Sequence, residues 1–204
     1  RVLHPGWVWY AGHYGVWFHV RSAFGFTPGT LVCRVGKEEG MRTGNPVTGA
    51  ALDLNHARIE LLGVKDEPGV AAKLFAALGE AGVSADMIIQ GVPGAAASRQ
   101  QMAFMVHQEL LEEALEAVRP VVERLGGRVN ADSGMAKLSI VGISLGSTPG
   151  VAARMFEAVA SVGANIEMIA TSEVRVSVVI RAHKGKEALS AVHAAFGLGG
   201  EAGG

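Results

Sequence analysis

The hydrophobic pattern of this chain occurs twice. The stretch "KDEPGVAAKLF", residues 65–75, returns as "GSTPGVAARMF", residues 146–156. After each Pro-Gly, apolar residues follow at i, i+3, i+4 and i+7, which is the spacing of an amphipathic helix with one buried face. These residues are Ala71, Leu74, Phe75 and Leu78 in the first copy and Ala152, Met155, Phe156 and Val159 in the second. The pattern predicts two related units.

Apolar segments of strand character flank each of these helices. The first copy reads as a strand at 58–64, the helix, strands at 83–90 and 101–107, a second helix at 109–125 and a fourth strand at 128–132. The second copy reads as strands at 137–143, 164–171 and 173–180, with its second helix at 184–196. This order predicts an α+β fold of tandem ferredoxin-like βαββαβ domains, in which helices cover one face of an antiparallel sheet.

Two segments lie outside the repeat. A strand candidate at 47–53 precedes the first copy, whereas the second copy lacks a closing strand, so we expect the former to fill a vacant sheet position across the repeat. Residues 1–46 carry all three tryptophans followed by turn-rich sequence, which favours a separate element and linker. The predicted domains are 47–132 and 133–198, with a tail at 199–204.

The composition is that of a folded protein without the charge excess that polyanionic partners require. Among 204 residues, 49% are hydrophobic and 18% charged, and 18 basic against 19 acidic residues give a net charge of −1. We therefore expect neither nucleic acid nor a membrane as a partner. Cys33 is the only cysteine, which excludes an intrachain disulfide and favours a reducing compartment. Because no membrane span or export signal is evident, the expected location is the cytoplasm.

The Pro-Gly before each helix is the most informative local feature. If Pro68 and Pro149 are the first helical residues, the following backbone N–H groups and the helix dipole form an anion-binding site. Thr148 then takes the capping position in the second copy, whereas Asp66 lies just outside the first helix. A free amino acid suits that arrangement, since its carboxylate takes the N–H groups and its ammonium takes Asp66. The alternative, that Asp66 caps the helix, stays open.

Other chemical signals are weak. "GTLVCRVGKE" has the wrong spacing for a phosphate loop, and Cys33 lacks a catalytic signature. The seven histidines show no paired metal spacing, so we predict no metal site. Met87 and Met168 are predicted to be core residues. No nucleophile stands out.

The segments "GVKDEPGVAAKLFAALGEAGVSADMIIQ" and "TPGVAARMFEAVASVGANIEMIATSEVRVSVVIR" closely resemble the tandem ACT domains at the C-terminal end of aspartate kinases, and "TSEVRVSVVI" is the most specific part. The opening "RVLHPGWVWYAGHYGVWFHVRSAF" with "PGTLV" resembles the last portion of the amino acid kinase domain of that family. The resemblance implies a regulatory region over 47–198, preceded at 1–46 by a remnant of the kinase domain.

The resemblance also implies how this chain is used. The Lys-Phe-Gly-Gly type motif with which the family holds ATP does not occur here, so the chain alone is predicted to be inactive and to need no cofactor. ATP and Mg would be used by a catalytic subunit of aspartate kinase as its partner. Some family members pair such a subunit with a regulatory subunit that corresponds to the C-terminal part of the same gene, and Met41 is a plausible start for one.

For the effector, the resemblance implies a homodimer in which the first ACT domain of one chain meets the second of its partner. One wall carries Asp66, Ala71, Ser84, Ala85, Asp86 and Gln90, and the other carries Asn165, Ile166 and Ser172. Threonine is favoured and lysine possible, as feedback inhibitors of aspartate phosphorylation in lysine, threonine and methionine biosynthesis. The alternatives are a stand-alone ACT amino-acid sensor, a regulatory partner of another biosynthetic enzyme, and an enzyme on a ferredoxin-like scaffold. The scarcity of clustered acid, base and nucleophile candidates opposes the last of these.

Overall fold

The structure is a computed structural model that describes residues 5–21, 29–32, 45–91 and 99–198. It divides between Asn45 and Pro46 into two units, each considered by itself. Cys33, Met41 and the tail at 199–204 lie outside the described residues. In the described part, every helix is too short or too polar to cross a membrane.

The first unit is small and rich in exposed aromatic residues. Helix α1 (Pro5–Tyr14) is followed by strands β1 (Phe18–Val20) and β2 (Thr30–Val32), which pair antiparallel. Of its described hydrophobic residues only Ala11 is buried, while Trp7, Trp9 and Trp17 are exposed. An apolar hollow of about 460 Å³ lies among the side chains of α1, Val16 and Phe18. The unit therefore presents apolar surface that its described residues leave uncovered.

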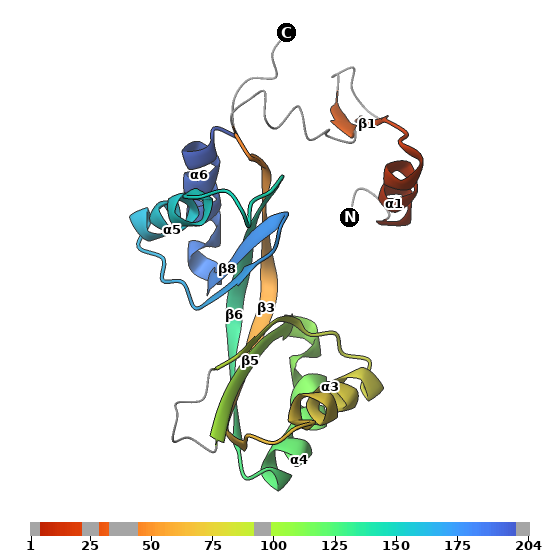
Figure 1. Cartoon of the computed structure of the whole chain (residues 1–204), viewed down its shortest axis with the longest axis vertical. Helices are drawn as coiled ribbons and strands as arrows, with labels where there is room; N and C mark the ends of the chain where they lie inside the picture. Colours follow the sequence, from red (N-terminus) through yellow and green to blue (C-terminus); the bar gives the residue numbers. More distant parts are fainter. Residues whose placement is uncertain (1–4, 22–28, 33–44, 92–98, 199–204) are drawn as a thin grey trace. The chain divides into compact units, whose positions relative to one another are not determined.

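The second unit is built on one antiparallel sheet with the strand order β4-β5-β3-β6-β8-β7. The central strands are long: β3 spans Val47–Lys65 and β6 spans Arg128–Gly142. They run side by side through two lobes (Figure 1). The outer strands are β4 (Asp86–Gln90) and β5 (Arg99–His107) in the first lobe and β7 (Met168–Thr171) and β8 (Arg175–Arg181) in the second.

Two helices cover the sheet in each lobe (Figure 1). They are α3 (Val70–Glu80) and α4 (Leu111–Arg124) in the first lobe and α5 (Val151–Ser161) and α6 (Gly185–Phe196) in the second, with short 3₁₀ turns at Gln108–Leu110 and Ala182–Lys184. The predicted amphipathic faces are confirmed, since Leu74 and Leu78 of α3 and Met155 and Val159 of α5 are buried. Each lobe thus has its own hydrophobic core.

The strand at 47–53 lies outside the domain to which the predicted boundary assigns it. It fills a vacant sheet position across the repeat, as expected: in the second lobe Ala50 pairs with Ile140 and Leu52 with Leu138, and Val47 lies in the second core. The assignment of this segment to the first domain, within 47–132, is therefore corrected. The physical reason is that β3 passes from the second lobe into the first as one continuous strand, so the closing strand of the second lobe comes from before the first repeat.

A third cluster lies where the lobes meet. Met87, Met105, Met135, Met168 and Val179 pack together and are buried. Met105 points away from the helices, because its neighbours Phe104 and Val106 face the first core and successive strand residues alternate. The prediction that Met87 and Met168 are core residues is confirmed.

Candidate effector-binding site

The two helices after Pro-Gly begin later than predicted. Helix α3 starts at Val70 and α5 at Val151, and the capping residues are Gly69 (φ 91°) and Gly150 (φ 84°) in the left-handed region. The expectation that the prolines are the first helical residues is wrong, since the glycine turns the chain just before the helix, a conformation that glycine adopts without strain.

The beginning of α3 still offers free donors. The N–H groups of Val70 and Lys73 donate to the carbonyl oxygens of Glu67 and Gly69, at 3.3 and 3.0 Å. Between them, the N–H groups of Ala71 and Ala72 have no acceptor within the described structure. The start of a helix carries partial positive charge, so an anion is favoured there.

Asp66 precedes Ala71 by five residues in the chain and is exposed. No side chain caps α3, so the alternative that Asp66 is its capping residue is contradicted. Within the part of the chain that the structure describes, the Asp66 carboxylate has no hydrogen bond or ion pair. A carboxylate and two unpaired N–H groups are therefore available within the segment from Asp66 to Ala72.

The beginning of α5 is different. The Ser147 hydroxyl donates to the Ser144 carbonyl at 3.2 Å and lies 3.3 Å from Glu173 Oε1. The Thr148 hydroxyl donates to the Ser144 carbonyl at 2.7 Å and does not cap the helix. Both hydroxyls are used locally, so the two helix starts differ in chemistry as the sequence predicts.

The remaining predicted residues follow the two edge strands of the sheet. Ser84 and Ala85 precede β4 and Gln90 ends it; Asn165 and Ile166 precede β7. Ser172 follows β7, where its N–H and hydroxyl donate to the Arg175 carbonyl at 2.7 and 3.3 Å. Within one chain β4 and β7 contact each other, and Met87 and Met168 lie in one buried cluster, but no described interaction joins Asp66 to Asn165 or Ser172. Asp66 is therefore not linked to the second predicted wall within a single chain.

Asp86 is already paired within the chain. Its carboxylate accepts the Met87 N–H at 2.8 Å and forms an ion pair with Lys137 of β6. Burial raises the pKa of Asp86, but the hydrogen bonds from Lys137 and Met87, with the charges of Lys137 and Arg175, outweigh it and hold that pKa below its ordinary value. Asp86 thus links the lobes in addition to any contact with an effector.

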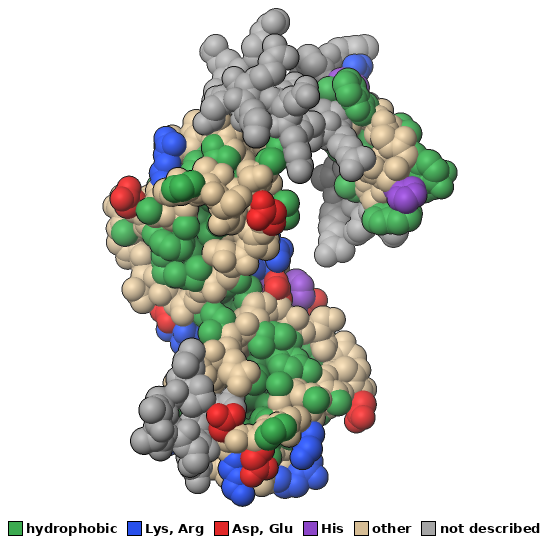
Figure 2. Space-filling model, in the orientation of Figure 1, with side chains coloured by type: hydrophobic (Ala, Val, Ile, Leu, Met, Phe, Trp, Pro, Cys, Tyr) green, Lys and Arg blue, Asp and Glu red, His purple; other side chains and the backbone are tan. Residues whose placement is uncertain are grey.

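A second ion pair, which sequence reasoning missed, mirrors the first. Arg58 of β3 lies 2.8 Å from Glu167 at the start of β7, and also 3.2 Å from Glu60 and 3.8 Å from Asp132. Figure 2 shows basic, acidic and histidine side chains gathered where the lobes meet. The signal was present in the repeat, because Arg58 aligns with Lys137 and Asp86 with Glu167.

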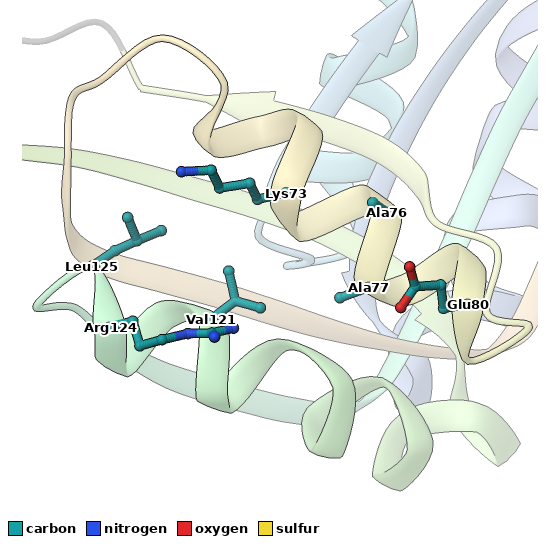
Figure 3. Close-up of a pocket in the computed structure, with 7 residues that line it drawn as sticks. All are labelled: Lys73, Ala76, Ala77, Glu80, Val121, Arg124 and Leu125. Atoms are coloured by element: carbon teal, nitrogen blue, oxygen red, sulfur yellow. The ribbon is translucent and has the colours of Figure 1, made fainter.

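One groove stands apart from the predicted site. It has a volume of about 560 Å³ and lies between α3 and α4 (Figure 3). Lys73 and Glu80 reach it from α3 and Arg124 from α4, and Ala76, Ala77, Val121 and Leu125 complete its lining. It contains none of the predicted effector residues.

A set of side chains suited to a metal lies at the lobe junction. Asp53, His56 and His107 each offer a ligand atom, and these atoms lie within 4.8 Å of one another. The spacing of histidines along the sequence predicted no metal site. His56 and His107 are far apart in the sequence, and only the pairing of β3 with β5 brings them together.

Two βαββαβ lobes that share one sheet define a tandem ACT-domain protein, and the family model described as ACT domain matches residues 59–120 and 138–196. Aspartokinase from Thermus thermophilus is 59% identical over 198 residues, which cover 97% of this chain and 48% of that protein. The chain thus spans about half the length of the curated relatives it matches.

Solved structures agree. The ligand-free regulatory subunit of aspartate kinase from Thermus thermophilus superposes with a TM-score of 0.70 at 60% identity, covering 74% of this chain and 99% of that one. A structure of aspartokinase alpha and beta subunits matches with a TM-score of 0.68 at 37% identity, covering 74% of this chain and 99% of that one. The chain belongs to the aspartate kinase family and corresponds to its regulatory subunit.

Proposed function

We propose that this chain binds a free end-product amino acid, threonine in preference to lysine, at the beginning of α3. Binding inhibits the phosphorylation of aspartate by a catalytic chain that uses ATP and Mg. The chain itself supplies no catalytic residue, and its role is feedback regulation of lysine, threonine and methionine biosynthesis.

The observation that carries this proposal is that the segment before and at the start of α3 offers both donors for a carboxylate and an acceptor for an ammonium group. The N–H groups of Ala71 and Ala72 are available to a carboxylate, and the unpaired Asp66 carboxylate is available to an ammonium group. A zwitterionic amino acid satisfies both, and charge-assisted hydrogen bonds are stronger than neutral ones.

The preference for threonine follows from the few acidic groups at this place. Lysine would bring a second ammonium group and need a second acceptor. The other carboxylate at this helix start, that of Glu67, lies 3.8 Å from the Lys65 ammonium, so it is already partly neutralised. A short polar side chain makes no such demand.

A second copy of the chain would complete the site. The edge strands β4 and β7 expose Ile88 (52%) and Ile169 (42%), which occupy the same position in the two repeats. Pairing of β4 of one chain with β7 of another would bury both and would bring Asn165, Ile166 and Ser172 of the partner toward Asp66. Unpaired edges with apolar side chains favour such association.

Residues 1–46 fit the end of an amino acid kinase domain. The regulatory subunit covers 74% of this chain, whereas the aspartokinase relative covers 97%. The remainder of a kinase domain would cover the exposed tryptophans of the first unit. The structure of alpha and beta subunits in a relative supports a catalytic partner for this chain.

Regulation requires that threonine bind one arrangement of the lobes more tightly than another. A coupling free energy of about 1 to 3 kcal/mol between the effector and catalytic sites gives roughly 5- to 150-fold modulation. Threonine held between two chains would supply such a difference, because the complete site exists only when the two chains adopt the paired arrangement.

Calorimetric titration with threonine and with lysine tests the proposal. We expect threonine to bind the unaltered chain, and Asp66→Asn to weaken it at least about tenfold, equivalent to about 1.4 kcal/mol. Glu67→Gln is the matched control, since it removes the neighbouring exposed carboxylate and should leave threonine affinity nearly unchanged. Unchanged affinity in Asp66→Asn, or binding of lysine with no response to threonine, would overturn it.

A further inference from the structure

Three side chains with metal-ligating atoms converge at the lobe junction. His56 of β3 and His107 of β5 are opposite partners in the sheet, and their ring centroids lie 5.0 Å apart. The His56 Nδ1 atom lies 3.5 Å from Asp53 Oδ1. Imidazole nitrogen and carboxylate oxygen form the ligand set of many zinc sites.

A β-bulge produces this convergence. In a regular strand, residues three apart such as Asp53 and His56 point to opposite faces. Against β6, however, Asp53 pairs with Lys137 and His56 with Met135, so β3 carries one additional residue between them. The extra residue turns Asp53 to the face of the sheet on which His56 lies.

His56 is the member that requires a partner. It is 2% exposed, and its Nδ1 atom has no hydrogen bond within the described structure. An unpaired buried polar atom is costly, and a metal ion would satisfy it.

The repeat supplies an internal comparison. Asp53, His56 and His107 align with Asp132, Met135 and Arg181 in the other half of the sheet. There, Arg181 lies 2.7 Å from Asp132, so the carboxylate is neutralised by an ion pair and no imidazole is present. Of the two equivalent places, only the one with the two histidines presents three potential metal ligands.

We propose that Asp53, His56 and His107 bind a divalent transition-metal cation of the Zn²⁺ class and so fasten β3 to β5 at the lobe junction. Two nitrogen ligands favour Zn²⁺, Co²⁺ or Ni²⁺ over Mg²⁺ or Ca²⁺. Water or a fourth ligand completes the coordination.

The geometry permits this with small side-chain movements. Zn–N bonds of about 2.0–2.1 Å place tetrahedral ligands roughly 3.3 Å apart, so separations of up to 4.8 Å must close by up to about 1.5 Å. His107 is exposed and the Asp53 side chain is 42% exposed, which leaves a path for the ion, although Asp53 Oδ1 also accepts the Asn55 N–H at 3.1 Å. The ammonium of Lys137 is the nearby opposing charge, and its ion pair with Asp86 offsets it.

The test is titration of the full, chelator-treated chain with Zn²⁺ by calorimetry and with Co²⁺ by visible absorption. The variant His56→Met/His107→Arg carries the residues of the equivalent place, and Asp53→Asn preserves the shape of the carboxylate. We expect the unaltered chain to bind Zn²⁺ and to melt at a higher temperature with it, and the double variant to lose at least about tenfold in affinity. Asp53→Asn should weaken binding less. His183→Ala, which removes an exposed histidine outside the cluster, is the control and should bind as the unaltered chain does.

Equal binding in the unaltered chain and the double variant would overturn the proposal, as would a folded unaltered chain that binds no metal. A thiolate-to-Co²⁺ charge-transfer band would also overturn it, because the signal would then come from Cys33. Circular dichroism of each variant confirms that it is folded. Threonine affinity should be unaffected by His56→Met/His107→Arg, so failure of the metal site leaves the effector proposal intact.

Discussion

Lys137 of β6 and Asp86 of β4 form an ion pair that joins the two lobes of one chain. The pair of Arg58 and Glu167 repeats it with the lobes exchanged. Each repeat contributes a base near the middle of its long central strand and an acid at the start of its edge strand, and each base meets the acid of the other repeat. This reciprocity holds the beginnings of β4 and β7 together and thereby fixes where the two predicted effector walls begin.

Loss of the Glu167 charge should destabilise the second unit. The side chains of Arg58 and Glu167 are only 13% and 19% exposed, so Glu167→Gln leaves a largely buried guanidinium without its nearest carboxylate. We expect a loss of about 1–3 kcal/mol in the free energy of unfolding, measured by urea denaturation. The control is Glu187→Gln, which removes a more exposed partner of Lys184 and should cost less than about 1 kcal/mol. Equal losses would show that the inter-lobe pair does not stabilise the fold.

The Asp86 ion pair should also make the stability of the fold depend on pH in the acid range. Because the pKa of Asp86 is lower in the folded chain than its ordinary 3.8, its contribution to stability is fully present above that value and is lost as pH falls through the folded pKa. In Lys137→Met, NMR titration of the Asp86 carboxyl should show its pKa raised, since burial then acts with less opposition. Lys184→Met removes a lysine from another ion pair and should leave the pKa of Asp86 unchanged. An unmoved pKa in Lys137→Met would contradict this assignment.

Periodicity predicted the elements better than their partners. The spacing of Leu74 and Leu78 identified α3, because an amphipathic helix needs only local pattern. The strand at 47–53 was found and was expected to fill a position across the repeat, but the predicted domain boundary still placed it in the first domain, since its alternation fits a neighbour in either lobe. Its partner, the β6 segment around Leu138, lies far along the chain. The pairing of strands far apart in the sequence depends on which arrangement buries the apolar side chains of both lobes.

In the candidate site, too, features set by neighbouring residues were predicted, whereas features set by contacts between distant residues were missed. Asp66 was predicted from the residues next to it, but whether it caps α3 depended on the left-handed turn at Gly69, which the adjacent proline obscured. The meeting of His56 with His107 requires the register of β3 and β5, so no local spacing could reveal it. Arg58 and Glu167 could have been found by comparing charges at aligned positions of the repeat.

The glycines before α3 and α5 should resist substitution. Gly69 and Gly150 have φ of 91° and 84°, and a Cβ at either would meet no atom within 4 Å. Any cost of alanine therefore comes from the backbone, and we expect a loss of about 1–2 kcal/mol in each variant by urea denaturation. Gly79→Ala is the matched control: it also meets open space but lies inside α3 without positive φ, so it should stabilise by about 0.5–1 kcal/mol. Stabilisation by Gly69→Ala would show that the turn tolerates a side chain.

The second unit should fold and bind threonine without the first. None of the three described core clusters includes a residue before Val47, so each lobe is packed from within residues 46–91 and 99–198. A chain that starts at Met41 should match the full chain in free energy of unfolding to within about 0.5 kcal/mol, by urea denaturation. Calorimetry should give the same threonine affinity for both. The shorter chain should also scatter less light at high concentration, because Trp7, Trp9 and Trp17 are removed from its surface. A loss of stability beyond this range would show that the aromatic unit packs on the lobes and contributes to their cores.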